Sequence, residues 1–212
     1  MRTMKILITG GSTWIKIDEV RIITNIFTGG TALFLAKEFK KKKHQVTLLI
    51  NPSRLKEMPS GIQVKTFRFF DELQAKLKTE LKDGKYDIII HSAAVSDYRL
   101  KSILRGKLSS GKEKVTLTLV KTAKLIKLIR RLAKQSYLVQ FKLETKKNGL
   151  VEKAFRSLQE NQSDLVVANC LQDIKLGYKA FLIDRDKKII PVSSRRELSS
   201  LLLQSFSKLA SC

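Results

Sequence analysis

The stretch MKILITGG, residues 4–11, decides the fold class of this chain. It is apolar and rich in β-branched residues until it ends in two glycines, and the runs HQVTLLI at 44–50 and YDIIIHSAAV at 86–95 are similar in composition. Apolar runs without alternation are typical of strands buried on both faces of a parallel sheet. Between the first two lies GGTALFLAKEFKKKKH at 29–44, which has helical spacing and ends in lysines. Strand, helix and strand in this order predict a doubly wound α/β fold.

The rest of the chain continues this alternation. Amphipathic helical patterns lie at 71–84, 122–135 and 149–161. Further buried strand patterns lie at 137–141 and 164–171. KAFLIDRDKKIIPV at 179–192 alternates around DRDK, which predicts a hairpin, and Ser194 and Glu197 have capping-box spacing at the start of a last helix. We expect one domain over 1–212, with a Rossmann-like, mostly parallel sheet and a C-terminal hairpin plus helix.

One segment interrupts the pattern. SDYRLKSILRGKLSSGKEKVTLTLVK, residues 96–121, is basic and rich in serine and glycine, and its last part, KVTLTLVK, alternates like an exposed or half-buried strand. A loop of this length in a compact domain is usually functional. We therefore expect a flap with its own strand at about 97–121 that covers a site or pairs with another subunit.

Composition excludes several classes of protein. With 43% hydrophobic and 29% charged residues the chain is typical of a globular domain, and no apolar run approaches the roughly 18 to 20 residues that cross a bilayer. No signal-peptide core is present, so we expect a cytoplasmic protein without a membrane partner. The only cysteines are Cys170 and Cys212 and the only histidines are His44 and His91, which provides neither a disulfide framework nor a zinc site. We expect no metal held by the protein itself.

The formal net charge of +23 calls either for an anionic partner or for an explanation by composition. The lysines are spread over nearly every segment and lack the interleaved aromatic residues of single-strand binders. A general excess of lysine on solvated faces is the favoured interpretation. Nucleic-acid binding as the main role is the less favoured alternative.

Ligands of doubly wound folds bind beyond the carboxyl ends of the strands, so the residues that directly follow the predicted strands are the candidates. These are Gly10, Gly11, Ser12, Thr13, His91, Ser92, Ala93, Ala94, Asp97, Glu144, Thr145 and Asn169, and we expect them to converge on one crevice. The turn GGST lacks the G-x-G-x-x-G fingerprint, which disfavours a nicotinamide enzyme. TGGTA at 28–32 offers the free N–H groups of a helix start to an anion. These features predict an enzyme for a phosphorylated, nucleotide-like ligand.

Five ordered stretches carry a resemblance to a known family. They are ILITGGSTWIKIDEVRIITNIFTGG, SAAVSDY, GKLSSGKEKVTLTLVKTAK, QFKLET and SDLVVANCL, between residues 6 and 171. In sequence and order they resemble the motifs of the bacterial phosphopantothenate-cysteine ligases of coenzyme A synthesis, in the stand-alone form. The resemblance implies a cytoplasmic homodimer whose flap contributes across the interface.

The resemblance also implies a reaction. In that family CTP reacts with the carboxylate of 4'-phosphopantothenate to give an acyl-cytidylate and pyrophosphate, and the amine of cysteine then displaces CMP. A carboxylate becomes reactive toward an amine once it carries a good leaving group, and Mg²⁺ and lysines offset the charge that develops on the phosphates. CTP, 4'-phosphopantothenate and cysteine are the implied substrates.

Site residues are implied position by position. Lys107 would contact the triphosphate, and Asn25 would hold and orient the acyl-cytidylate. The remaining implied nucleotide-site residues are Gly10, Gly11, Thr28 and Gly29 in the anion-binding turns, Ser92, Ala93 and Asp97 at the cytidine, Ala123, Lys124, Leu125 and Ile126 along the nucleotide, Phe141 packed against it, and Arg156 at the triphosphate.

Several positions depart from the family pattern. Ala32 stands where glycine is usual, Ala123 replaces a proline, Glu160 replaces a triphosphate-binding lysine, and Ile26 and Phe27 replace more polar residues beside Asn25. These departures leave open an alternative, a degenerate ligase-fold protein that binds nucleotide or nucleic acid without ligase activity.

Overall fold

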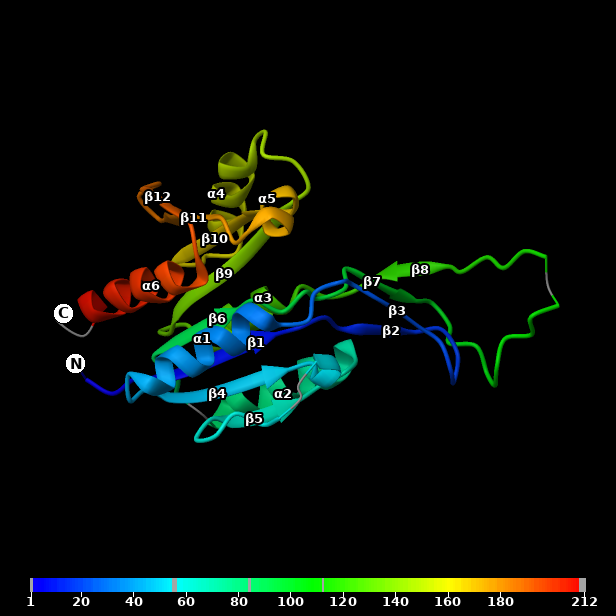
Figure 1. Ribbon diagram of the computed structural model, residues 1–212. Coiled ribbons are helices and arrows are strands. Elements are labelled where there is room, and N and C mark those ends of the chain that lie inside the picture. Colours follow the sequence, from blue (N-terminus) through cyan, green and yellow to red (C-terminus); the bar gives the residue numbers. More distant parts are fainter. Residues whose placement is uncertain (1, 55–56, 84, 112, 210–212) are drawn as a thin grey trace.

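An eight-stranded sheet with helices on both faces forms the body of the molecule (Figure 1). The computed structural model describes residues 2–54, 57–83, 85–111 and 113–209, so Lys112 of the predicted flap and Cys212 lie outside the described residues. In spatial order the strands are β12 (Ile189–Val192), β11 (Ala180–Asp184), β10 (Leu165–Cys170), β9 (Tyr137–Glu144), β6 (Ile88–His91), β1 (Lys5–Gly10), β4 (Gln45–Ile50) and β5 (Gln63–Thr66). All neighbours pair in parallel except β10 with β11 and β11 with β12. The predicted fold class, including the C-terminal hairpin and helix, is confirmed.

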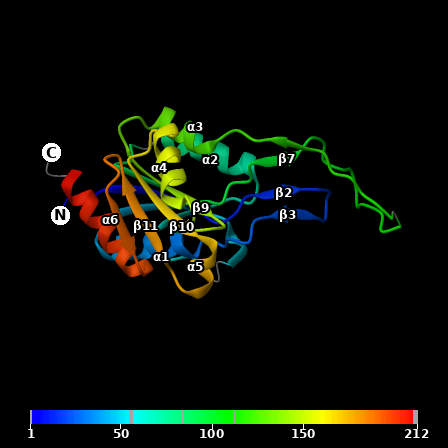
Figure 2. The ribbon, with the colours of Figure 1, turned by 90° about the horizontal axis from the view of Figure 1, so that it is seen from above.

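The helices form two layers over this sheet (Figure 2). They are α1 (Gly30–Lys41), the short 3₁₀ helix η1 (Pro52–Arg54), α2 (Phe70–Asp83), α3 (Leu125–Leu132), α4 (Leu150–Glu160), α5 (Leu171–Leu176) and α6 (Arg195–Leu209). On one face Ile6 and Ile8 of β1 share a core with buried residues of α1 and α6. On the other face Leu7 packs with α2 and α3, and α4 covers Val166 and Ala168 of β10. Each central strand therefore buries both of its faces, which explains the absence of alternation in its sequence.

The strand order reverses at β1. From β1 the chain proceeds outward through β4 to β5 and then returns to β6 on the other side of β1. The carboxyl ends of β1 and β6 lie side by side at this point, with Thr9 paired to His91. Such a switch point is where open α/β sheets bind their ligands.

An arm projects from this edge of the sheet (Figures 1 and 2). We use the name arm for two segments: the hairpin of β2 (Trp14–Lys16) and β3 (Ile22–Thr24), and the predicted flap, which contains β7 (Tyr98–Leu100) and β8 (Leu119–Lys121). β2 lies beside β7. The strand expected over the whole of KVTLTLVK is limited in the structure to the three residues of β8. The hairpin itself was not predicted.

Close packing of α1 on β1 fixes the start of the helix at the switch point. A Cβ atom added to Gly10 would lie 2.2 Å from the Cβ atom of Ala32, and one added to Gly29 would lie 2.7 Å from the backbone nitrogen of Gly11. Gly29 also has a φ angle of +81°, in the left-handed region that favours glycine. Because Ala32 has a methyl group at this contact, the strand residue opposite it has to be glycine.

This contact gives a stability prediction with an internal rescue. Gly10→Ala is expected to lower the free energy of unfolding by about 3 kcal/mol through overpacking. Ala32→Gly in the same chain removes the opposing methyl group and should restore stability to within about 1 kcal/mol, the cost of a helical glycine. Urea unfolding followed by circular dichroism measures both.

Gly30→Ala is the matched control, because a Cβ atom there meets nothing within 4 Å. It should not destabilise the protein. An unchanged stability of Gly10→Ala, or a double variant no more stable than the single one, would show that this contact does not constrain the fold.

Candidate functional site

A pocket of about 490 Å³ lies at the carboxyl ends of β6 and β9, between α3 and α4. Its lining includes eight of the residues that the sequence assigned to nucleotide binding: Ala93, Asp97, Ala123, Lys124, Leu125, Ile126, Phe141 and Arg156. They come from three separate stretches and from α4. The sheet topology is what brings them together, because the parallel strands that precede them end at one edge.

Most charged side chains that line the pocket are cationic, and carboxylates that also line it neutralise some of them. Lys124 pairs with Asp97, and Glu144 accepts from Lys142 at 3.1 Å and from Lys153 at 3.0 Å. The hydrogen bonds from Lys153 and Lys142 lower the pKa of Glu144, so this carboxylate keeps both lysines in place near neutral pH.

Two cations of the pocket remain for an anionic ligand. Lys127 and Arg156 line it, and neither has an ion-pair partner in the described part of the chain. Glu160, the departure from a family lysine, also lines the pocket and is exposed. Lys153 does not simply replace the missing lysine, because Glu144 already holds its ammonium group.

Neutral polar groups form the inner wall of the pocket. Burial lowers the pKa of His91 to about 4, so its imidazole is uncharged at neutral pH, and its Nδ1 lies 2.8 Å from the hydroxyl of Thr9. Gln140 accepts hydrogen bonds from Asn161 and Ser163 at 3.0 Å each. Gln140 and Asn161 were not predicted as site residues; the available signal was a polar residue inside an apolar run, for Gln140, or at the end of a helical pattern, for Asn161.

The predicted single crevice is divided in the structure. Gly10, Gly11 and Gly29 pack against one another where α1 begins, and neither they nor Thr28 line the pocket. The backbone N–H groups at the start of α1 lie at the same edge of the sheet, and anion binding by them stays a prediction. Thr31 of this turn accepts a hydrogen bond from Arg195 at 3.1 Å.

Two predicted residues are engaged in contacts within the chain. The hydroxyl of Ser92 donates to the carbonyl of Thr9 at 2.7 Å, and Ser92 does not line the pocket. Asn169 donates to the carbonyl of Lys179 at 3.0 Å. Both side chains thus stabilise the backbone near the strand ends. Contact of Ser92 with cytidine stays a prediction.

Asn25 lies beside the pocket, at the base of the arm. Its Nδ2 donates to the carbonyl of Ala94 at 3.2 Å, next to pocket residue Ala93. The hydroxyl of Ser12 donates to the carbonyls of Asn25 and Phe27, which fixes the backbone on both sides of Ile26. Asn25 is exposed and therefore accessible to a substrate.

Lys107 lies at the other end of the hairpin. Its neighbours Gly106 and Leu108 are hydrogen-bonded to Glu19 and Asp18, in the turn between β2 and β3. The three residues of β3 separate this turn from Asn25, a length of about 10 Å. Lys107 does not line the pocket of its own chain. Asp18 lies in one of the motifs that carry the resemblance, but its role was not predicted from the sequence.

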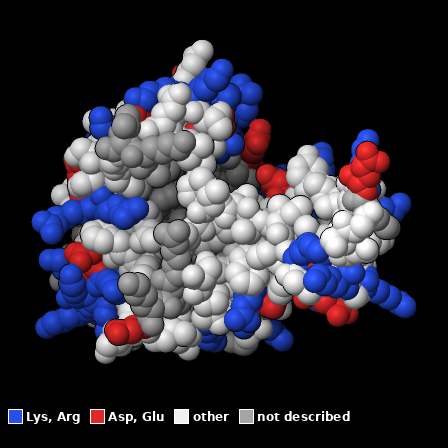
Figure 3. Space-filling model, turned by 45° about the vertical axis from the view of Figure 1, so that its right-hand side comes forward, with Lys and Arg blue, Asp and Glu red and all other residues white. Residues whose placement is uncertain are grey.

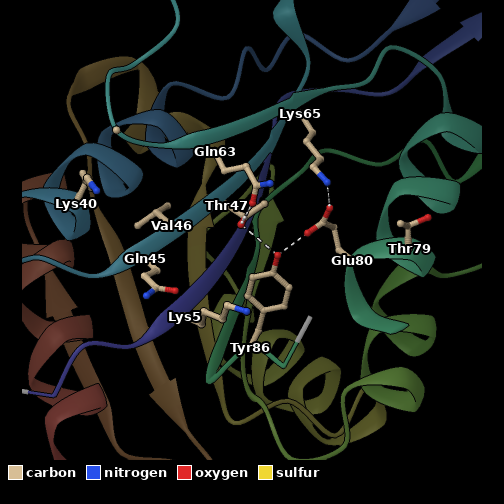
Figure 4. Close-up of a pocket in the computed structure, with 11 residues that line it drawn as sticks. Lys5, Lys40, Gln45, Val46, Thr47, Gln63, Lys65, Thr79, Glu80 and Tyr86 are labelled. Atoms are coloured by element: carbon tan, nitrogen blue, oxygen red, sulfur yellow. Dashed lines mark hydrogen bonds and ion pairs between the residues drawn. The ribbon is translucent and has the colours of Figure 1, made fainter. Parts of the chain in front are cut away.

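A second cavity of about 410 Å³ lies at the amino ends of β1 and β4 (Figure 4). Figure 4 shows Glu80 between Lys65 and Tyr86, and the hydroxyl of Tyr86 also donates to Thr47 at 3.1 Å. Burial and the Glu80 carboxylate raise the pKa of Tyr86 above its usual range. These groups satisfy one another, and the cavity lies away from the carboxyl ends of the strands.

The surface charge is dispersed over the face seen in Figure 3. Lys and Arg occupy several separate areas there, on the body and on the projecting arm, with a broad uncharged area between them. This agrees with lysines on solvated faces better than with one nucleic-acid groove. Among the described residues no cluster of three metal-ligating side chains occurs, and no helix is long and apolar enough to span a bilayer.

Comparison with known proteins places this geometry in a family. Residues 1–209 match the DNA/pantothenate metabolism flavoprotein C-terminal domain. The Coenzyme A biosynthesis bifunctional protein CoaBC of Thermococcus kodakarensis is 33% identical over 210 residues, which cover 97% of this chain and 51% of the relative. The corresponding protein of Bacillus subtilis is 29% identical and likewise covered over 51% of its length. The chain thus spans about half the length of the curated relatives it matches.

Solved structures agree with the sequence matches. The crystal structure of the DNA/pantothenate metabolism flavoprotein from Streptococcus pneumoniae superimposes with a TM-score of 0.87 at 29% identity, over 98% of this chain and 100% of that one. A Cab2 variant in complex with phosphopantothenate-cysteine shares the fold, with a TM-score of 0.80 at 18% identity, over 99% of this chain and 89% of that one. The resemblance seen in the sequence is thereby confirmed, and this chain belongs to the family of the DNA/pantothenate metabolism flavoprotein C-terminal domain.

Proposed function

We propose that this protein ligates 4'-phosphopantothenate to cysteine in a CTP-dependent reaction that proceeds through an acyl-cytidylate. The observation that carries the proposal is the convergence of eight expected nucleotide-site residues on one pocket at the carboxyl ends of β6 and β9. The family and its coenzyme A biosynthesis relatives support it. So does the phosphopantothenate-cysteine bound to a protein of the same fold.

The first step is displacement at phosphorus. A carboxylate oxygen of 4'-phosphopantothenate attacks the α-phosphorus of CTP, the bond from that phosphorus to the bridging oxygen breaks, and pyrophosphate leaves. Arg156 and Lys127 would offset charge on the phosphates, and Lys107 would stabilise the departing pyrophosphate. Mg²⁺ would enter with CTP and neutralise part of the triphosphate charge, because the described residues offer no carboxylate cage for it.

The second step is acyl transfer. The amine of cysteine attacks the acyl carbon, a proton leaves the nitrogen, and CMP departs with the electron pair of the acyl–oxygen bond. Asn25 would hold the acyl group for this attack, since its side chain lies next to the pocket residues that follow β6. A neutral amide suits this role because it can donate and accept hydrogen bonds without a change of charge.

We further propose that the active form is a dimer in which the arm reaches the partner. Of the eleven large apolar side chains exposed in the described chain, eight lie on or beside the arm: Val20, Ile22, Ile23, Ile26, Tyr98, Ile103, Val115 and Leu119. An exposed apolar surface of this kind is typical of an interface. Lys107 lies outside its own pocket, so a second copy would explain how it contacts a nucleotide.

Pyrophosphate release by the purified protein tests the proposed reaction. Release is expected only when CTP, Mg²⁺ and 4'-phosphopantothenate are all present, and amide product only after cysteine is added. A coupled pyrophosphate assay and mass spectrometry of the product measure the two steps. CTP binding without pyrophosphate release would instead support the degenerate nucleotide-binding alternative, which Glu160 in the pocket motivates.

The two candidate catalytic residues should affect different steps. Lys107→Ala is expected to slow pyrophosphate release by about a hundredfold, the typical effect of removing one transition-state contact. Asn25→Ala should leave that step less affected and let the acyl-cytidylate accumulate. Rapid quench of single turnovers separates the steps. Wild-type rates for both variants would show that these residues do not have the proposed roles.

Mixed dimers test the arm exchange. If Lys107 acts in the partner's pocket, Lys107→Ala and Asn25→Ala homodimers each have two defective sites, whereas a mixed dimer has one intact site. Random exchange of subunits should therefore restore about a quarter of the wild-type rate, given twofold symmetry. Activity of the mixture no higher than the mean of the two variants would exclude a site shared in this way.

A further inference from the structure

The most enclosed carboxylate of the arm is that of Asp18, in the turn between β2 and β3. Its side chain has 0% exposure although the arm projects from the body of the molecule (Figures 1 and 2). Its Oδ1 accepts from the backbone N–H groups of Val20 and Arg21, both at 2.7 Å. Its Oδ2 accepts from Arg21 Nη1 at 2.6 Å and from the backbone N–H of Leu108 at 2.9 Å.

These bonds link two segments that are far apart in the chain. Asp18 and Leu108 are separated by 90 residues, and Leu108 directly follows Lys107. The backbone adds two further links, from Glu19 N–H to the carbonyl of Gly106 at 3.3 Å and from Leu104 N–H to the carbonyl of Ile17 at 2.9 Å. Lys107 thus lies between two residues that the hairpin turn holds from both sides.

We infer that Asp18 is a positioning residue that presents Lys107 to the triphosphate by holding the flap against the hairpin turn; this inference rests on the proposed function. Asp18 would not touch substrate. Its effect on the reaction is transmitted through the backbone at 106–108, because a charge-assisted bond to Leu108 restricts where the neighbouring lysine can reach.

The electrostatics agree with this geometry. The N–H of Leu108, followed by those of Val20 and Arg21, holds the pKa of Asp18 well below its usual range. The carboxylate is therefore charged throughout the physiological range. Four donors converge on its two oxygens, so both oxygens are needed as acceptors.

This arrangement makes Asp18→Asn a selective variant. If the amide oxygen keeps the two backbone bonds within the hairpin turn, the amide NH₂ faces Leu108 N–H and the Arg21 guanidinium, which are both donors. The hairpin turn is retained while the side-chain link from Asp18 to Leu108 is lost. Glu19→Gln, at the next residue, is the matched control. It removes one negative charge, as Asp18→Asn does, but Glu19 is exposed and the new amide oxygen can still accept from Gly106 N–H.

The experiment compares wild type, Asp18→Asn and Glu19→Gln in the full-length protein. Asp18→Asn should lower kcat/KM for CTP in pyrophosphate release by between about tenfold and a hundredfold, the cost of misplacing a catalytic group by about 1 Å. The reaction of cysteine with preformed, enzyme-bound acyl-cytidylate should stay within about twofold of wild type. Trypsin should cleave within 101–114 faster in Asp18→Asn, whereas Glu19→Gln behaves as wild type in all three assays.

Other outcomes overturn the inference. Equal slowing of both chemical steps would mean that Asp18 acts on the whole fold, and wild-type rates with wild-type cleavage would mean that it positions nothing. If wild type itself releases no pyrophosphate, the proposed function fails, and the trypsin comparison still decides about the link. Faster cleavage of Asp18→Asn then supports the link between Asp18 and the flap, and equal cleavage refutes it.

Discussion

The structure depends on how closely α1 approaches the end of β1. A side chain at Gly10 would meet Ala32, and a side chain at Gly29 would meet the backbone of Gly11, so neither position has room for one. This contact directs the positive end of α1 at the edge of the sheet where the strand order reverses. The same edge carries the nucleotide-sized pocket, so helix dipole and pocket cations act on neighbouring regions. A rearrangement at this contact would disturb both elements at once.

The arm extends the same edge outward. The chain that leaves β1 bridges to the chain that leaves β6, with Ser12 opposite Ala94, and Ser96 Oγ accepts a hydrogen bond from Thr13 Oγ1. Hairpin and flap therefore start side by side and are joined again near the far end by Asp18. The exposed apolar side chains of the arm lack cover within one chain. A second copy of the chain, as in the proposed dimer, would supply that cover.

Much of the fold followed from residue pattern, because strands buried on both faces cannot alternate. The runs at 4–10, 44–50 and 86–91 were predictable for this reason. β5 was not, since the segment QVKT offers one large apolar residue. β3 is apolar and β-branched, as a buried strand would be, but its exposure and its pairing with β2 cannot be read from the sequence pattern. Eight of the pocket-lining residues followed from ordered motifs, which give positions but no pairings. The link from Asp18 to the flap spans 90 residues, a separation that no local pattern reports.

Hydrogen–deuterium exchange with and without CTP and Mg²⁺ tests the central claim most directly, because it locates the nucleotide independently of turnover. Binding in this pocket predicts slower exchange of backbone amides at 92–97 and 122–127, which line or flank it between α3 and α4. Amides at 63–66 and 79–86, around the cavity at the opposite edge, should be unchanged. Slowing confined to those latter segments, with none at 92–97 or 122–127, would contradict the account.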